Sequence, residues 1–253
     1  MIKRSLLMLA LITRFAIVAA SAADGTRHVP TIDELLTLKT VGGAQISPDG
    51  KWVGYTVGWG DFKQDAFVTQ IWLAEVETGR TFQLTRGDKS STTPRWSPNG
   101  EWLAFLSNRI EDKNQIFLIN PLGGEARQIT KSETSISNFA WSDDGQTIAY
   151  LATEPVPQVS KDRKDYLGDF EVVRKEYSFS HIWTLNLSEA TNAPVAGKQR
   201  TKKKDFSVDS LSWSPDGSKI AFSATVNPDL IQGVTSDIYV LNVADDSFKK
   251  IVS

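Results

Sequence analysis

One type of segment recurs four times along the chain, and this repetition constrains the fold more than any other feature. Each copy places a glycine-containing turn between two apolar runs: QISPDGKWVGYTV (45–57), RWSPNGEWLAFLS (95–107), AWSDDGQTIAYLA (140–152) and SWSPDGSKIAFSA (212–224). A further apolar run follows each copy, at 70–76, 115–121, 181–187 and 237–243. One more follows at 82–85, 127–130 and 249–252, and in the third copy it is expected within 194–201. Four short runs per period predict four strands per repeat.

The turn chemistry supports hairpins inside each repeat. Ser-Pro-Asp-Gly suits a type I turn, because Ser favours the first position, Pro presets φ at the second, and Gly accepts a positive φ at the fourth. The third copy has Asp143 where the other copies have Pro, and a type I turn tolerates this exchange. We therefore expect each of these turns to join two antiparallel strands.

The strands are apolar on both faces, as in LAFL (103–106) and IFLI (116–119). Strands of this kind are covered by neighbouring layers on both sides, and repeats of about 45 residues with four strands are typical of propeller blades. We predict an all-β fold, a β-propeller of four-stranded antiparallel blades. About four blades are present and the ring is incomplete, with blades at about 43–86, 92–130, 137–201 and 207–252.

Two segments precede the repeats. Residues 1–22 read as a secretory signal peptide, with Lys3 and Arg4 ahead of an apolar stretch and a small-residue cleavage pattern ending at Ala22. A membrane anchor is the alternative, but Arg14 interrupts the apolar run and the run is short for a span. The sequence therefore predicts export and no stable membrane span after cleavage.

Residues 23–42 form the N-terminal segment, which contains a predicted short helix at 31–39. Thr31 and Glu34 have the spacing of a capping box. Leu35, Leu36 and Leu38 give the helix an apolar side, which we expect to pack against the first blade.

Seven of the eight tryptophans recur at equivalent positions of the repeats, which predicts packing between blades. Trp59, in the predicted loop GWGDFKQDAF (58–67), lies outside the pattern and stays unassigned. The third repeat carries an insertion at about 153–180. We expect its first part, with Pro155 and Pro157, to be extended or mobile. The whole insertion is either a loop directed at a partner domain or substrate or a solvated excursion.

Composition excludes several kinds of function. The chain has no Cys and two His, His28 and His181, and its net charge is −2, which argues against thiolate metal sites, a cysteine nucleophile and nucleic acid as a partner. No G-x-S-x-G, P-loop, G-x-G-x-x-G or H-E-x-x-H motif occurs. His181 stands where other repeats have Gln70, Gln115 and Asp237, so a place at a blade edge is favoured over a general base. The sequence thus assigns no catalytic, cofactor-binding or metal-binding residue, and leaves substrate-binding residues unknown.

The segment TIDELLTLKTVGGAQISPDGKWVGYTV (31–57), with the later QIWLAEVETGRTFQLT, SHIWTLNL and LSWSPDGSKIAFSATVNPD, resembles secreted serine peptidases of the prolyl-oligopeptidase family, in the acylaminoacyl-peptidase and dipeptidyl-peptidase branch. The resemblance covers about 30–253. It implies an N-terminal propeller that restricts access to a C-terminal α/β-hydrolase domain carrying Ser, Asp and His. No catalytic residue can be carried over, because no matching hydrolase segment occurs in this sequence.

Two functions follow as hypotheses. The first is the substrate-gating propeller portion of an exported peptidase that acts on peptides, inactive without its hydrolase domain. The alternative is a non-catalytic periplasmic propeller that binds a protein partner, similar to the Tol-system propeller, which shares the SPDG repeat. In either case we expect the chain alone to expose an unpaired final strand edge and to associate.

Overall fold

The computed structural model describes residues 28–155, 158–168, 178–202, 206–226 and 236–252, and their strands form four antiparallel sheets of four strands each. The first two sheets contain β1 (Thr40–Ile46), β2 (Trp52–Asp61), β3 (Ala66–Glu75), β4 (Thr81–Gln83), β5 (Ser91–Trp96), β6 (Leu103–Ser107), β7 (Gln115–Ile119) and β8 (Arg127–Gln128). The other two contain β9 (Ile136–Trp141), β10 (Thr147–Thr153), β11 (Ser180–Asn186), β12 (Lys198–Gln199), β13 (Ser207–Trp213), β14 (Lys219–Thr225), β15 (Ser236–Asn242) and β16 (Phe248–Val252). Strands lie in each sheet in their sequence order, which confirms the predicted four-stranded blades. We number them blades 1 to 4.

The repeated turn closes the first hairpin of every blade as expected. In blade 1 the Gly50 amide donates to the Ser47 carbonyl oxygen at 2.9 Å, and Gly50 has a φ of +72°. The Asp49 carboxylate accepts from the Ser47 hydroxyl at 2.6 Å and from the Lys51 amide at 3.1 Å. The other three turns repeat this bonding with Asn99, Asp144 and Asp216. The turn therefore depends on an oxygen-bearing side chain at its third position.

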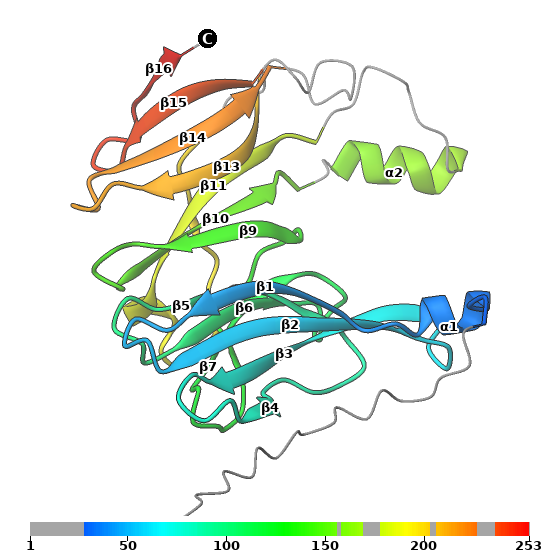
Figure 1. The fold of residues 1–253 in the computed structure, drawn as a ribbon. Helices are drawn as coiled ribbons and strands as arrows, with labels where there is room; N and C mark the ends of the chain where they lie inside the picture. The colour runs from blue at the N-terminus through cyan, green and yellow to red at the C-terminus, as the bar shows by residue number, and fades with distance from the viewer. Residues whose placement is uncertain (1–27, 156–157, 169–177, 203–205, 227–235, 253) are drawn as a thin grey trace, which may run out of the picture.

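Successive blades pack face to face in chain order. The first strands of the blades contact one another in the series β1, β5, β9, β13, and Figure 1 shows β4 and β16 at opposite ends of the stack. Tryptophans at equivalent positions bond across all three seams: Trp96 Nε1 donates to the Gln45 carbonyl oxygen, Trp141 Nε1 to that of Arg95, and Trp213 Nε1 to that of Ala140. This confirms the predicted role of these tryptophans in packing between blades.

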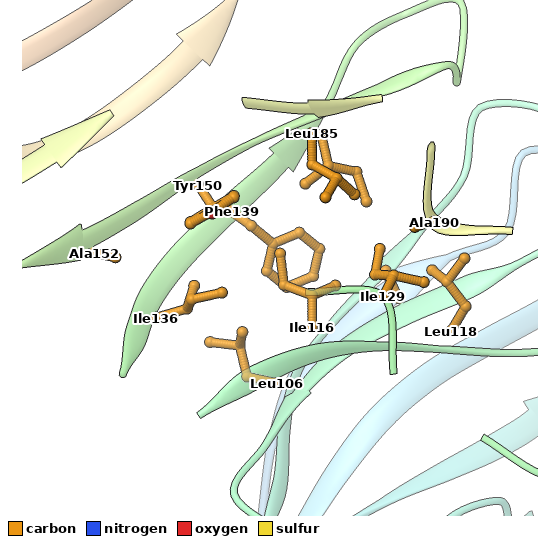
Figure 2. Close-up of a cluster of buried hydrophobic side chains, with 12 residues drawn as sticks. Leu106, Ile116, Leu118, Ile129, Ile136, Phe139, Tyr150, Ala152, Leu185 and Ala190 are labelled. Carbon is orange, nitrogen blue, oxygen red and sulfur yellow. The ribbon is translucent and has the colours of Figure 1, made fainter. Parts of the chain in front are cut away.

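Each seam holds its own apolar core. We call the side of a blade that meets the preceding blade its leading face, and the opposite side its trailing face. In the seam between blades 2 and 3, the trailing side chains of Leu106, Ile116 and Leu118 pack against the leading side chains of Phe139 and Tyr150, as Figure 2 shows. In this seam an aliphatic trailing face therefore packs against an aromatic leading face.

The N-terminal helix α1 (Ile32–Leu36) has the predicted capping box, in which the Glu34 amide donates to Thr31 Oγ1 and the Thr31 amide to the Glu34 carboxylate. The prediction that its apolar side is buried is wrong, because no residue of α1 is buried and Leu35 is 54% exposed. The helix meets blade 1 through its backbone instead: the Leu36 carbonyl oxygen lies 2.5 Å from where a Cβ on Gly60 would stand.

Two loop predictions also need correction. The hairpin of β2 and β3 extends to Asp61 and Ala66, so Trp59 lies in a strand, paired with Val68. The first part of the insertion is not extended: it contains helix α2 (Gln158–Leu167). The second part of the insertion, 169–177, lies outside the described residues. None of the helices in the described ranges is long and apolar enough to cross a membrane.

Candidate functional site

The departures from the repeat gather at one end of the blades. Helix α1, the β2–β3 hairpin tip and helix α2 lie at the end opposite the Ser-Pro-Asp-Gly turns, as Figure 1 shows. We call this end the loop face. Loops tolerate variation while the strands beneath them stay regular, so the loop face is where a propeller places binding groups.

A cavity of about 360 Å³ opens on the loop face between blades 2 and 3. Its rim carries Glu111 and Lys113 from the β6–β7 connection, and Lys131 and Glu133 from the β8–β9 connection. Pro155, three residues before α2, lines the same cavity. Charges of both signs around an apolar interior suit a peptide, which combines a polar backbone with apolar side chains.

The interior of the cavity is aromatic. Tyr150 and Trp183 lie opposite each other on β10 and β11 and stack with their ring centroids 6.3 Å apart. Tyr150 is 1% exposed, and this burial raises the pKa of its hydroxyl to about 12. The Gly197 amide contacts the Tyr150 hydroxyl at 3.1 Å, and a Cβ on Gly197 would stand 2.4 Å from that oxygen. Only glycine therefore fits beside this tyrosine without a shift.

The insertion that carries α2 is anchored beside a buried histidine. His181, on β11, is completely buried, and its Nε2 lies 3.4 Å from Glu154 Oε1, at the end of β10. The Glu154 amide donates to the Phe179 carbonyl oxygen at 3.1 Å. Burial lowers the pKa of His181, and the nearby Glu154 carboxylate opposes this in part. The imidazole is therefore neutral at pH 7.

A repeated side-chain contact assigns the tautomer of that imidazole. In blades 1 and 2 a threonine hydroxyl donates to a glutamine: Thr85 to Gln70 and Thr130 to Gln115, each at 2.8 Å. Each threonine oxygen also accepts an amide of the same blade's third strand. Thr201 repeats this geometry with His181 Nδ1 at 3.2 Å and the Ile182 amide at 3.0 Å. Thr201 therefore donates to Nδ1, and Nε2 carries the proton that faces Glu154.

The two histidines do not form part of a hydrolase triad in the described residues. A triad needs one imidazole nitrogen on a nucleophile and the other on an orienting acid. His181 Nδ1 is held by Thr201, so only an acid, Glu154, remains at Nε2. His28 Nε2 contacts both carboxylate oxygens of Glu34, at 3.0 and 2.9 Å, beside the start of α1. Among the described residues, no group of three or more His, Cys, Asp or Glu side chains is arranged to hold a metal ion.

Sequence reasoning missed the cavity and the glutamine–threonine contacts. The contacts had a signal, because glutamine and threonine are 15 residues apart in both of the first two blades. In blade 3 His181 and Thr201 are 20 residues apart, which hides the correspondence. The cavity had no such signal, because it is lined by connections from two different blades.

Comparison with known proteins supports the resemblance found in the sequence. The family profile described as "Dipeptidyl peptidase IV (DPP IV) N-terminal region" matches residues 60–157. The chain is 36% identical over 93 residues to the uncharacterized peptidase YuxL of Bacillus subtilis. That alignment covers 37% of this chain and 14% of the relative. It is 27% identical over 265 aligned positions to dipeptidyl-peptidase 5 of Porphyromonas endodontalis, covering 94% of this chain and 38% of the relative. The chain thus spans well under half the length of these relatives.

Solved structures show the same fold at low sequence identity. An acylaminoacyl peptidase from Pyrococcus horikoshii superposes with a TM-score of 0.62 at 16% identity, over 87% of this chain and 33% of that one. A putative TolB from Agrobacterium tumefaciens superposes with a TM-score of 0.57 at 17% identity, over 85% of this chain and 62% of that one. Peptidase and Tol-type propellers therefore share the fold, and the sequence relatives favour the peptidase.

Proposed function

We propose that this chain, which corresponds to the N-terminal propeller portion of prolyl-oligopeptidase-family peptidases, restricts the access of peptide substrates to a serine-hydrolase domain. In this proposal the catalytic serine, acid and histidine come from the hydrolase domain. The propeller contributes the selection of substrates by size.

One observation carries the proposal. A dipeptidyl-peptidase aligns with 94% of this chain, and that alignment occupies only 38% of its own length. The chain therefore matches a portion of a peptidase that extends well beyond it. Within this chain the histidine geometry supports a catalytic centre elsewhere, because Thr201 holds one nitrogen of His181 and Glu154 lies at the other.

The loop face is the surface that we assign to the hydrolase domain and the substrate. It combines α1, α2 and the cavity between blades 2 and 3. Trp183 would contact apolar side chains of a peptide, while Lys131 and Glu133 would contact its charged groups. We further assign residues 1–22 to a signal peptide, 23–42 to the segment with α1, and 43–253 to the propeller blades, so that the protein acts after export.

An antibody against this chain tests the proposal in the source cells. The captured material is treated with a fluorophosphonate probe, which labels reactive serines, and assayed with short blocked peptides and with an unfolded protein of similar composition. We expect a labelled serine and cleavage of the short peptides alone. Captured material with no labelled serine would contradict the assignment to a peptidase, and equal cleavage of the unfolded protein would contradict gating.

The Tol-type alternative makes the opposite prediction for the same sample. Its support is a likeness in fold at 16–17% identity, which both classes share. A captured protein partner without any reactive serine would favour it.

A further inference from the structure

Arg109 is a half-buried cation on the loop face, in the connection between β6 and β7. Its guanidinium carbon lies 5.3 Å from the ring centroid of Phe105 and 5.1 Å from that of Phe117, the two aromatic residues that blade 2 packs on blade 1. Burial lowers the pKa of the guanidinium below its ordinary value, but an arginine stays protonated at neutral pH. Within the described ranges no carboxylate forms an ion pair with it. A charge that is partly removed from water in this way favours an anion as its partner.

Two serines hold one edge of this guanidinium. Its Nε donates to Ser107 Oγ at 3.1 Å, and its Nη2 donates to Ser91 Oγ at 2.8 Å. The two serines are paired across β5 and β6, and Ser107 Oγ donates in turn to the Ser90 carbonyl oxygen at 2.8 Å. The serines and the aromatic rings therefore fix both the plane and the rotation of the guanidinium.

The other edge of the guanidinium is free to bind. A guanidinium carries five N–H donors in one rigid plane, and the two serines use one on Nε and one on Nη2. The three donors that remain lie on Nη1 and Nη2, and Arg109 makes no other hydrogen bond to a residue that the structure describes. We call this edge, formed by Nη1 and Nη2, the free edge.

The blade architecture does not require an arginine at this position. Nine residues after the turn glycine of each blade stand Trp59, Arg109, Glu154 and Val226, which are four side chains of different chemistry. In blade 3 the charged side chain at this position, Glu154, lies beside His181 of the third strand. The arginine of blade 2 has no such partner.

The neighbouring polar groups are used in other contacts. Gln115 takes the place of His181 in blade 2, and its side-chain amide bonds within the β8–β9 connection. Of the two acids that follow Arg109 in the same connection, Asp112 pairs with Lys89 and Glu111 lines the cavity between blades 2 and 3. The partner of the free edge is therefore not one of these side chains.

We propose that the free edge of Arg109 binds a carboxylate group of a peptide. The two oxygens of a carboxylate match the two parallel N–H bonds that one guanidinium edge donates, and such charge-assisted pairs are about twice as strong as neutral hydrogen bonds. Because the serines and the rings already hold the guanidinium, little side-chain freedom is lost on binding. Both blades of this seam are described, so the site depends only on contacts within the chain. That the carboxylate belongs to a peptide rests on the proposed function.

Peptides that differ in one group test the chemistry of the ligand. N-acetyl-alanyl-alanine, its C-terminal amide and N-acetyl-aspartyl-alanine amide are titrated into the chain, and the Arg109 Nε–H signal is followed by ¹⁵N NMR. We expect this signal to shift, and a peptide with a carboxylate to bind at least about tenfold more tightly than the neutral amide. Tighter binding of the free acid would identify a terminal carboxylate, and tighter binding of the aspartyl peptide a side-chain carboxylate. Equal binding of all three peptides, binding of none, or equal binding of inorganic phosphate would overturn the proposal.

Variants assign the binding to the free edge. Arg109→Lys keeps the charge but loses the planar fork, so it should weaken binding of the favoured peptide at least about tenfold. Arg109→Gln should weaken it further. The matched control is Arg80→Gln, which removes the same charge from an exposed turn between β3 and β4 and should bind like the unchanged chain. Circular dichroism identifies the variants that fold, and Arg109→Lys decides if Arg109→Gln does not fold. A folded Arg109→Lys that binds normally, or a control that weakens equally, would contradict the assignment.

An acidic side chain of a hydrolase domain is the other source of a carboxylate for this edge. The material captured from the source cells separates the two, with the Arg109→Lys allele in a parallel strain. We expect a lower KM for peptides with the favoured carboxylate than for their amides, and no such difference in the variant. Equal KM values in material with a labelled serine would assign the edge to a contact between domains and overturn the proposal. Absence of a labelled serine contradicts the proposed function instead, and the peptide titrations still decide whether Arg109 binds a carboxylate.

Discussion

Trp96 Nε1 donates a hydrogen bond of 3.0 Å to the Gln45 carbonyl oxygen, which joins blade 2 to blade 1 across 51 residues of sequence. The same bond in the next seam, from Trp141 to Arg95, measures 3.4 Å. An N–H···O bond weakens as it lengthens beyond about 3.0 Å. The seams therefore share one bonding pattern and differ in the strength of their polar contact.

This difference predicts an order of stability effects. Trp96→Phe keeps an aromatic ring in the seam but leaves the Gln45 carbonyl oxygen without its indole donor, and we expect a loss of about 1 kcal/mol in the free energy of unfolding. Trp141→Phe should cost less, because its bond is longer. Urea unfolding followed by far-UV circular dichroism measures both values. The reverse order would show that the indole volume, rather than the hydrogen bond, governs the seams.

The sequence predicted the blades because their signal is local. The Ser-Pro-Asp-Gly turn, with Gly50 at a positive φ, and the apolar runs on either side determine each hairpin within about a dozen residues. The same local rules failed for α2. The segment is mostly charged and polar, and its few apolar residues do not recur with a helical period. Val159 and Tyr166 are 80% and 87% exposed, so no buried apolar stripe identified the helix.

The candidate site could not be predicted from local patterns. The pairing of β10 with β11 brings Tyr150 and Trp183 together across 33 residues of sequence, and only the stacking of the sheets adds Lys113 from a different blade. When a strand is apolar on both faces, its sequence does not show which face packs on the preceding blade and which on the next. The distinction between the leading Phe105 and the trailing Ala104 therefore required the structure.

Gly197 should not tolerate a larger side chain. A Cβ there would stand 2.4 Å from the Tyr150 hydroxyl oxygen and 2.9 Å from the Thr184 carbonyl oxygen. Overpacking of this kind costs about 1–3 kcal/mol, so Gly197→Ala should lower the free energy of unfolding by that amount. Gly42→Ala is the control, because its Cβ would have 3.6 Å of space.

A double variant identifies the atom responsible. Tyr150→Phe removes the hydroxyl that a Cβ on Gly197 would meet, so it should recover part of the loss in Gly197→Ala. Additive effects in the thermodynamic cycle would show that the Thr184 carbonyl oxygen is the dominant obstacle.

The turn of blade 4 should weaken in acid. Hydrogen bonds from Ser214 and Ser218 lower the pKa of Asp216 to about 2, below the ordinary value of 3.8. A carboxyl group with a lowered pKa in the fold stabilises it above its unfolded pKa and loses that contribution as the pH falls from about 4 toward 2. Asp216→Asn should remove this part of the pH dependence. Unfolding measured by urea at several pH values between these limits checks it, and parallel profiles for both proteins would refute it.

The predicted signal peptide gives a precise N-terminus. Export of the full chain in a bacterial host should release a protein that begins at Ala23, since the small residues Ala20 and Ala22 precede the expected cleavage. Mass spectrometry of the periplasmic fraction measures this end. Ala20→Leu combined with Ala22→Leu should block cleavage and leave the precursor in the membrane fraction. An intact Met1 in a soluble fraction of the unchanged chain would rule out the assignment.

The fold should tolerate His181→Gln, and this substitution should remove one pH-dependent contribution to the free energy of unfolding. Gln70 and Gln115 accept the threonine hydroxyl in blades 1 and 2, so His181→Gln can accept from Thr201 in the same way. Burial lowers the pKa of His181 in the fold below its ordinary value of 6.5. The neutral imidazole therefore stabilises the fold above about 6.5, and this contribution is lost as the pH falls below that value, because the unfolded state takes up the proton first. We expect the unchanged chain to lose stability from pH 7 to 5 more steeply than His181→Gln.

His181→Leu, which leaves the Thr201 hydroxyl without an acceptor, should be less stable than both at pH 7. A steeper profile for His181→Gln would mean that Glu154 raises the pKa of the imidazole more than burial lowers it.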